Sequence, residues 1–161
     1  MLITREMMKS IGDSRQKGDV AEHCAKALLT FYGAEILQPV TDTGIDFCFR
    51  WNLGGPVFDA QVEYSAGTVA PFIYDKKWRS PNLIFVAMTH FDNEPETMSC
   101  YVSRLEDFGD ESLTCLHHNR NGGASGPYRE LRPSPKHAEC RTKLRIENRV
   151  EFFRSLARPA I

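Results

Sequence analysis

The sequence lacks any long apolar run. None approaches the ~20 residues that a membrane-spanning helix requires, so we expect no membrane partner. Its first residues lack the organisation of a secretory signal, which favours a cytoplasmic location. Cysteine is scarce as well: five residues, an odd number scattered along the chain, predict reduced thiols rather than a disulfide framework. Internal repeats and a second domain boundary are not found, so residues 1–161 are expected to form one domain.

The net charge of −1 conceals an uneven distribution of charge. Residues 1–119 contain 10 lysines and arginines against 17 acids, whereas residues 120–161 contain 10 against 4. A basic segment beside an acid-rich body is typical of a local phosphate-binding surface, because clustered cations release counterions whatever the global charge. The alternative is a solvated basic helix and loop without a partner.

Apolar periodicity and turn residues divide the chain into alternating helices and strands. The predicted elements are a helix over 17–32, strands over 35–40, 45–51 and 57–64, a short helix over 71–79, strands over 82–89 and 99–105, and a helix over 146–156. From about residue 106 the chain is expected to form a loop-rich basic extension. This order favours an α/β fold in which helices flank a mixed central sheet of about five strands.

The predicted helix over 17–32 has apolar residues three or four positions apart. These are Val20, Cys24, Ala27, Leu28 and Phe31. Such spacing predicts that this face of the helix packs against the sheet. Glu22 and Lys26 are four residues apart and therefore share another face.

Acidic and amide side chains recur where two predicted strands meet. Asp46 lies between Ile45 and Phe47, although aspartate is disfavoured in strands. Gln61 and Glu63 share one face of the following strand. A turn between the strands would bring these oxygens together, and Mg²⁺ prefers oxygen ligands. The alternative is that Gln61 and Glu63 form the wet face of a half-exposed sheet.

These segments resemble the PD-(D/E)XK nuclease superfamily, closest to the archaeal Holliday-junction resolvases and small endonuclease-like domains of bacteria and phages. The resemblance covers about residues 12–105 and depends on residues 17–22, 44–47 and 59–63. It implies a restriction-endonuclease-like fold and Mg²⁺-dependent (or Mn²⁺-dependent) cleavage of DNA. The implied metal ligands are Glu22, Asp46, Gln61 and the carbonyl of Val62.

The sequence departs from that family at position 63, where the expected lysine is Glu63. Glu63 could serve as general base or bind a second metal. The lysine could instead have migrated to Lys26, one helical turn from Glu22. A third alternative is an inactive module of phage or defence origin that binds nucleic acid or a protein partner, and a fold unrelated to nucleases is a fourth. A register with Glu63 as the strand acid and Ser65 in place of lysine also lacks the cation.

A cationic and aromatic segment follows the acid cluster. Lys76, Lys77, Trp78 and Arg79 combine phosphate-binding cations with a ring that could stack on a base, so we expect DNA as a partner. Trp78 could alternatively pack against the sheet. Cleavage of both strands by a one-site nuclease would favour a homodimer, although the sequence does not indicate which surface would form its interface.

A second set of residues has the spacing of a structural zinc site. Cys115, His118, His137 and Cys140 form two pairs with two-residue gaps, which a tetrahedral Zn²⁺ can accept. The alternative is core or loop cysteines beside surface histidines.

Overall fold

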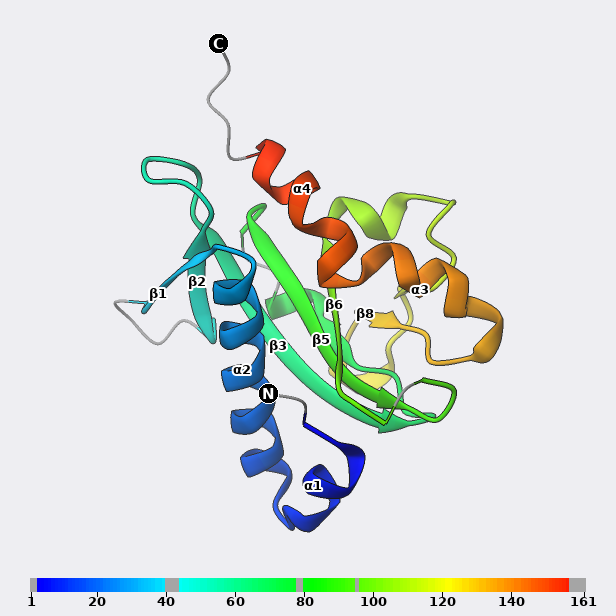
Figure 1. Ribbon diagram of the computed structural model, residues 1–161. Helices are drawn as coiled ribbons and strands as arrows, with labels where there is room; N and C mark the ends of the chain where they lie inside the picture. The colour runs from blue at the N-terminus through cyan, green and yellow to red at the C-terminus, as the bar shows by residue number, and fades with distance from the viewer. Residues whose placement is uncertain (1–2, 40–43, 78–79, 95, 157–161) are drawn as a thin grey trace.

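A computed structural model describes the chain except for residues 1–2, 40–43, 78–79, 95 and 157–161 (Figure 1). The helices are α1 (Arg5–Ser10), α2 (Ser14–Phe31), α3 (Ala138–Leu144) and α4 (Ile146–Leu156). The larger sheet contains β1 (Glu35–Leu37), β2 (Phe47–Arg50), β3 (Phe58–Gly67), β5 (Leu83–Phe91) and β6 (Ser99–Arg104). The smaller sheet contains β4 (Phe72–Tyr74), β7 (Leu116–Asn119) and β8 (Tyr128–Leu131).

The larger sheet has the strand order β1-β2-β3-β5-β6. Its neighbours are antiparallel except for β3 and β5, which run parallel. A parallel pair needs a crossover connection, and here the crossover contains β4 and a 3₁₀ helix, η1 (Asp75–Lys77). The predicted α/β fold, with a mixed sheet of five strands flanked by helices, is confirmed.

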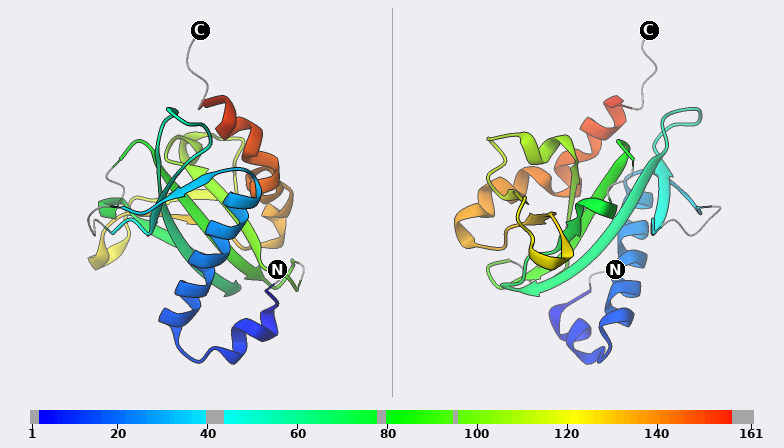
Figure 2. Two further views of the ribbon diagram at one scale, coloured as in Figure 1. Left: turned by 60° about the vertical axis from the view of Figure 1, so that its left-hand side comes forward. Right: turned by 180° about the vertical axis from the view of Figure 1, so that it is seen from behind.

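Two apolar clusters pack on opposite faces of the larger sheet. On one face, Ala21, Ala25 and Leu29 of α2 are buried beside Phe153 of α4. On the other face, the smaller sheet contributes residues such as Ile73. Front and back views show α2 and the smaller sheet on opposite sides of β3 and β5 (Figures 1 and 2). Residues of β3 therefore alternate between two enclosed faces, which fixes the direction of each polar side chain.

The buried face of α2 differs from the one predicted by periodicity. Alanines at 21 and 25 allow the helix to lie close to β3, whereas Phe31 is 80% exposed. The apolar stripe is thus rotated toward the smaller residues. The small alanines let the backbone of α2 pack close to the sheet, and the largest apolar side chain of the predicted face stays outside this contact.

The prediction for residues 71–79 is wrong in part. Residues 72–77 form β4 and η1 rather than a short helix, because Phe72 pairs with Glu130 of β8, far along the chain. The segment predicted to be loop-rich from about residue 106 includes two strands of four residues, β7 and β8. Two short helices, α1 and α3, have too few turns to produce a periodic signal and were not predicted.

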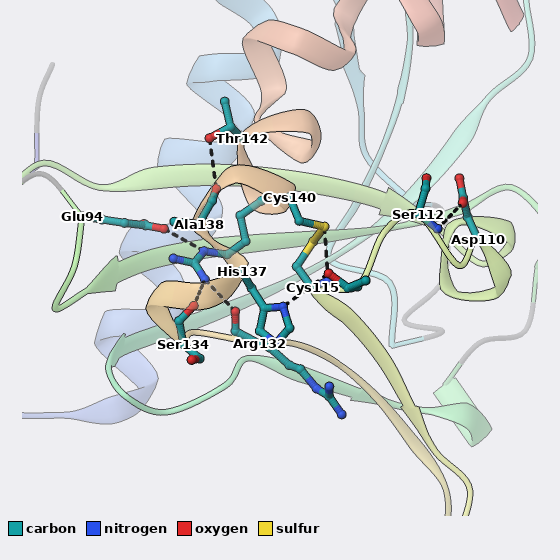
Figure 3. Close-up of a disulfide and its surroundings, with 12 residues drawn as sticks. Glu94, Asp110, Ser112, Cys115, Arg132, Ser134, His137, Ala138, Cys140 and Thr142 are labelled. Atoms are coloured by element: carbon teal, nitrogen blue, oxygen red, sulfur yellow. Dashed lines mark hydrogen bonds and ion pairs between the residues drawn. A yellow bond between two sulfur atoms is a disulfide. The ribbon is translucent and has the colours of Figure 1, made fainter.

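The structure also corrects the expectation that all five cysteines are reduced. Cys115, directly before β7, and Cys140, in α3, form a disulfide (Figure 3). Their Cα atoms are 5.8 Å apart, within the usual disulfide range. Cys24, Cys48 and Cys100 are free thiols. Within the described residues, no helix combines the length and the apolar character needed to cross a bilayer.

Candidate metal-binding site

The side chain of Asp46 is anchored where β2 meets β3. Asp46 lies one residue before β2, and its backbone N–H donates to the carbonyl of Ala60 (3.0 Å). Its Oδ2 accepts hydrogen bonds from Gln61 Nε2 (3.0 Å) and from the backbone N–H of Val62 (2.5 Å). The structure therefore brings together three of the four residues that the resemblance implies as metal ligands.

Glu22 and Lys26, on α2, influence this carboxylate through their charges. They form an ion pair with an Nζ–Oε1 distance of 2.6 Å. Lys26 Nζ also lies 5.3 Å from the centre of the Phe47 ring, next to Asp46 in sequence. Burial raises the pKa of Asp46; the Val62 hydrogen bond opposes this, the charge of Glu22 adds to it, and Lys26 opposes it. The charges of Glu22 and Lys26, both on α2, therefore affect the pKa of Asp46.

Glu63 has a cationic neighbour that the sequence analysis does not predict. Lys77 Nζ, at the end of η1, lies 3.8 Å from Glu63 Oε1. Burial raises the pKa of Glu63, the charge of Lys77 opposes this rise, and the charge of Asp46 adds to it. Lys77 also lowers the pKa of Asp46. The residue predicted to contact DNA phosphates is therefore part of the acid cluster.

The arrangement provides a set of oxygen donors with one lysine on each side. Among the described residues, no three acidic, histidine or cysteine side chains converge as a ready metal cage. One reason is that Glu22 faces Lys26 and Glu63 faces Lys77. Mg²⁺ commonly binds through only one or two carboxylates and keeps several waters. The carboxylate of Asp46 can supply one such oxygen, while the groups of Gln61 and Val62 that contact its Oδ2 are N–H donors.

Replacing Glu63 by glutamine should stabilise the protein near neutral pH. A carboxyl group with a raised pKa binds its proton more tightly in the folded than in the unfolded state. The free energy of unfolding therefore falls as pH rises from the ordinary glutamate pKa through the raised one. Glu63→Gln removes this loss, so urea unfolding should show a gain at about pH 7 and none at about pH 4.

The exposed Glu111 provides the control for this measurement, since Glu111→Gln makes the same chemical change on the surface. We expect it to leave the pH dependence of unfolding as in the wild type. An equal gain at both pH values in Glu63→Gln would contradict the assignment of the effect to a buried charge.

The four predicted zinc ligands are not gathered around a common point. The sulfurs of Cys115 and Cys140 are bonded to each other, so neither is a thiolate that could bind Zn²⁺. His118 Nε2, on β7 of the smaller sheet, lies 2.8 Å from Asp75 Oδ2 of η1. His137, labelled near the disulfide in Figure 3, has its Nδ1 3.4 Å from the hydroxyl of Thr114.

The cationic segment is described only in its first half. Lys76 Nζ lies 5.2 Å from the centre of the Tyr74 ring, and Lys77 belongs to the acid cluster. Trp78 and Arg79 lie outside the described residues. The predicted role of Trp78 in base stacking therefore stays a prediction.

A cavity of about 740 Å³ lies away from the acid cluster. It is lined at the end of β3 by Gly67 and by residues 132–137, which include His137. Glu63 precedes Gly67 by four residues, about 13 Å along an extended strand. We locate the candidate site from its convergent charges, because a phosphodiester backbone can bind an open surface and needs no enclosed cavity.

Comparison of the chain with protein-family models, with curated proteins and with solved structures gave no match.

Proposed function

We propose that this protein is a Mg²⁺-dependent DNA endonuclease of the PD-(D/E)XK type. The observation that carries the proposal is the position of Lys77 beside Glu63 and in the field of Asp46. The sequence places glutamate where that family has lysine. Lys77 would supply the same positive charge from η1, a different element of the fold.

Each residue would then have a distinct part in phosphodiester hydrolysis. Asp46, Gln61 and the Val62 carbonyl would hold Mg²⁺, and Glu22 would join them on release from Lys26. When bound, Mg²⁺ supplies Lewis-acid stabilisation of the negative phosphate oxygens. Glu63, with a pKa above the ordinary glutamate value, is suited to accept the proton of the attacking water. Lys77 would stabilise charge that develops on the phosphate.

The proposal is tested with purified protein and linear, supercoiled and branched DNA, in Mg²⁺, in Mn²⁺ and in EDTA. We expect cleavage only with the metals. Asp46→Asn, which keeps the size of the side chain but removes the charge, should reduce the rate about 100-fold or more. Failure of the wild type to cleave any of these substrates, or cleavage undiminished in Asp46→Asn, would overturn the proposal.

A catalytically inactive binding module is the second candidate. The ion pairs Glu22–Lys26 and Glu63–Lys77 favour it, because both neutralise carboxylates that a metal would need. This candidate predicts salt-dependent DNA binding, or a stable complex with a partner protein, without detectable Mg²⁺ affinity in calorimetry. A homodimer is expected only for the active enzyme acting on both strands.

A further inference from the structure

The outer face of the smaller sheet carries three aromatic rings in mutual contact. Phe72 and Tyr74 belong to β4, and Tyr128 lies opposite Tyr74 on β8. Ring centres are 5.2 Å apart for Phe72–Tyr74, 5.4 Å for Phe72–Tyr128 and 6.4 Å for Tyr74–Tyr128. Ile73, between the two β4 rings, is instead buried in the core. The rings therefore point away from the core by the alternation of the strand.

This aromatic face is held in place but left open to solvent. Phe72 is 39% exposed, and the other two rings are partly buried. Asn119 Nδ2 donates a hydrogen bond to the hydroxyl of Tyr128 (2.9 Å), which fixes that ring from β7. An ordered cluster of partly exposed rings offers flat apolar surface at a low cost in side-chain entropy.

The charges around the rings include an acid, Glu130 opposite Phe72, whose Oε1 lies 3.9 Å from Arg132 Nε, and cations at the edge of the rings. The ammonium group of Lys76 lies over Tyr74, two residues along the chain. Asp75, the acid between them, is paired with both Arg129 and His118. Arg129 offsets the negative charge of Asp75, and His118 forms a hydrogen bond to the same carboxylate. Lys76 adds a cation at the edge of the aromatic face. Cations beside stacking rings are the usual combination in surfaces that bind single strands.

The aromatic face is connected along the chain to the acid cluster. β4 leads directly into η1, and Lys77, the last residue of η1, contacts Glu63. A chain of nucleotides that crosses the rings and Lys76 would therefore approach the carboxylates through Lys77. The smaller sheet lies on the side of the larger sheet that faces away from α2 (Figure 2).

We propose that Phe72, Tyr74 and Tyr128 stack on the unpaired bases of single-stranded DNA, and thereby direct single-stranded or branched DNA to the acid cluster. The assignment of a substrate class rests on the proposed nuclease function. Unpaired bases are required because a duplex hides both faces of each base within its own stack. A double helix offers this surface only its phosphates.

The test measures binding apart from cleavage, with the Asp46→Asn protein in EDTA. A fluorescent 20-mer of thymidine and a duplex of the same length are the probes, and a single strand containing 2-aminopurine reports stacking directly. We expect quenching of 2-aminopurine and tighter binding of the single strand than of the duplex. Phe72→Ala and Tyr128→Ala should each weaken single-strand binding roughly tenfold, as expected for the loss of one stacked base.

Two matched variants separate stacking from other effects. Tyr128→Phe keeps the ring and should restore most of the binding that Tyr128→Ala loses. Phe31→Ala removes an exposed ring from α2, on the opposite side of the larger sheet, and should also leave binding unchanged. Circular dichroism of each variant verifies folding, and the quenching experiment needs no variant on the aromatic face.

Equal affinity for single strand and duplex, absence of quenching, or undiminished binding by Phe72→Ala would overturn the proposal. So would a change from dimer to monomer in Phe72→Ala without loss of DNA binding, because the face would then serve self-association. The two proposals fail separately. A wild type that binds and quenches but never cleaves refutes the nuclease alone, whereas cleavage unaffected by Phe72→Ala refutes the stacking surface alone.

Discussion

Substitution of Lys77 by alanine should lower the rate of Mg²⁺-dependent DNA cleavage by about 10²–10³-fold, the usual cost of removing one charge-stabilising donor from an active site. Lys77 Nζ lies 3.8 Å from Glu63, and its charge also lowers the pKa of Asp46. The loss should appear in kcat at saturating DNA, because the effect falls on the reacting phosphate and not on general attraction. Single-turnover cleavage of a labelled substrate measures this directly.

The same variant should change the pH dependence of the rate. Lys77 opposes the rise in the pKa of Glu63, so its removal raises that pKa further. If Glu63 must be deprotonated to act as base, the acidic limb of the pH–rate profile moves to higher pH. Lys77→Arg keeps the charge and should leave the limb close to its original position.

Two other lysines provide controls. Lys9→Ala removes an exposed cation in α1, remote from the acid cluster in the chain, and should not alter the rate. Lys26→Ala tests the alternative that the missing lysine migrated to α2. A large loss of kcat in Lys26→Ala, with Lys77→Ala close to wild type, would assign the catalytic cation to the helix instead and contradict the proposed role of Lys77.

Local sequence patterns were sufficient for the larger sheet. The alternation of residues 57–64 and the apolar run of 82–89 predict β3 and β5, because each strand is long enough to produce a periodic signal. The proximity of Asp46 to Gln61 could also be predicted, since β2 and β3 are adjacent antiparallel strands joined by a short turn. Contacts between neighbouring elements are encoded within one stretch of sequence.

Contacts between distant segments could not be predicted in this way. β4 pairs with β8, more than 50 residues further along the chain, and neither strand is longer than four residues. The position of Lys77 depends on that pairing, because β4 sets where η1 begins. The disulfide of Cys115 and Cys140 likewise depends on how α3 packs near the start of β7. Strands this short contain too few residues to show an alternating pattern. Packing between distant segments has no local sequence pattern at all.

Arg141→Met should be the most destabilising of the substitutions considered for this protein. Arg141 is completely buried, and its Nε donates to Glu94 Oε1 at 2.9 Å. Its Nη1 donates to the carbonyls of Arg132 (2.8 Å) and Ser134 (2.9 Å). Figure 3 shows Glu94, Arg132 and Ser134 around the turn that precedes Cys140. One guanidinium therefore neutralises a buried acid and fixes a loop between β8 and α3.

Removal of the guanidinium leaves the carboxylate of Glu94 buried without its cation, because its side chain is only 6% exposed. Breaking one partner of a buried pair costs about 3–5 kcal/mol, so urea unfolding should show a decrease of that size. For comparison, Lys9→Met breaks an exposed ion pair with Glu6 and should leave the free energy of unfolding almost unchanged.

The double variant Glu94→Gln with Arg141→Met distinguishes the charge from the packing. Because a neutral pair leaves no buried charge, much of the lost stability should return, as found when buried ion pairs are replaced together. Tyr101, whose hydroxyl also donates to Glu94, can still donate to the glutamine carbonyl. A double variant as unstable as Arg141→Met alone would show that the loop contacts with Arg132 and Ser134, and not the ion pair, determine the stability. In that case α3 is held to the sheet chiefly by hydrogen bonds to backbone carbonyls.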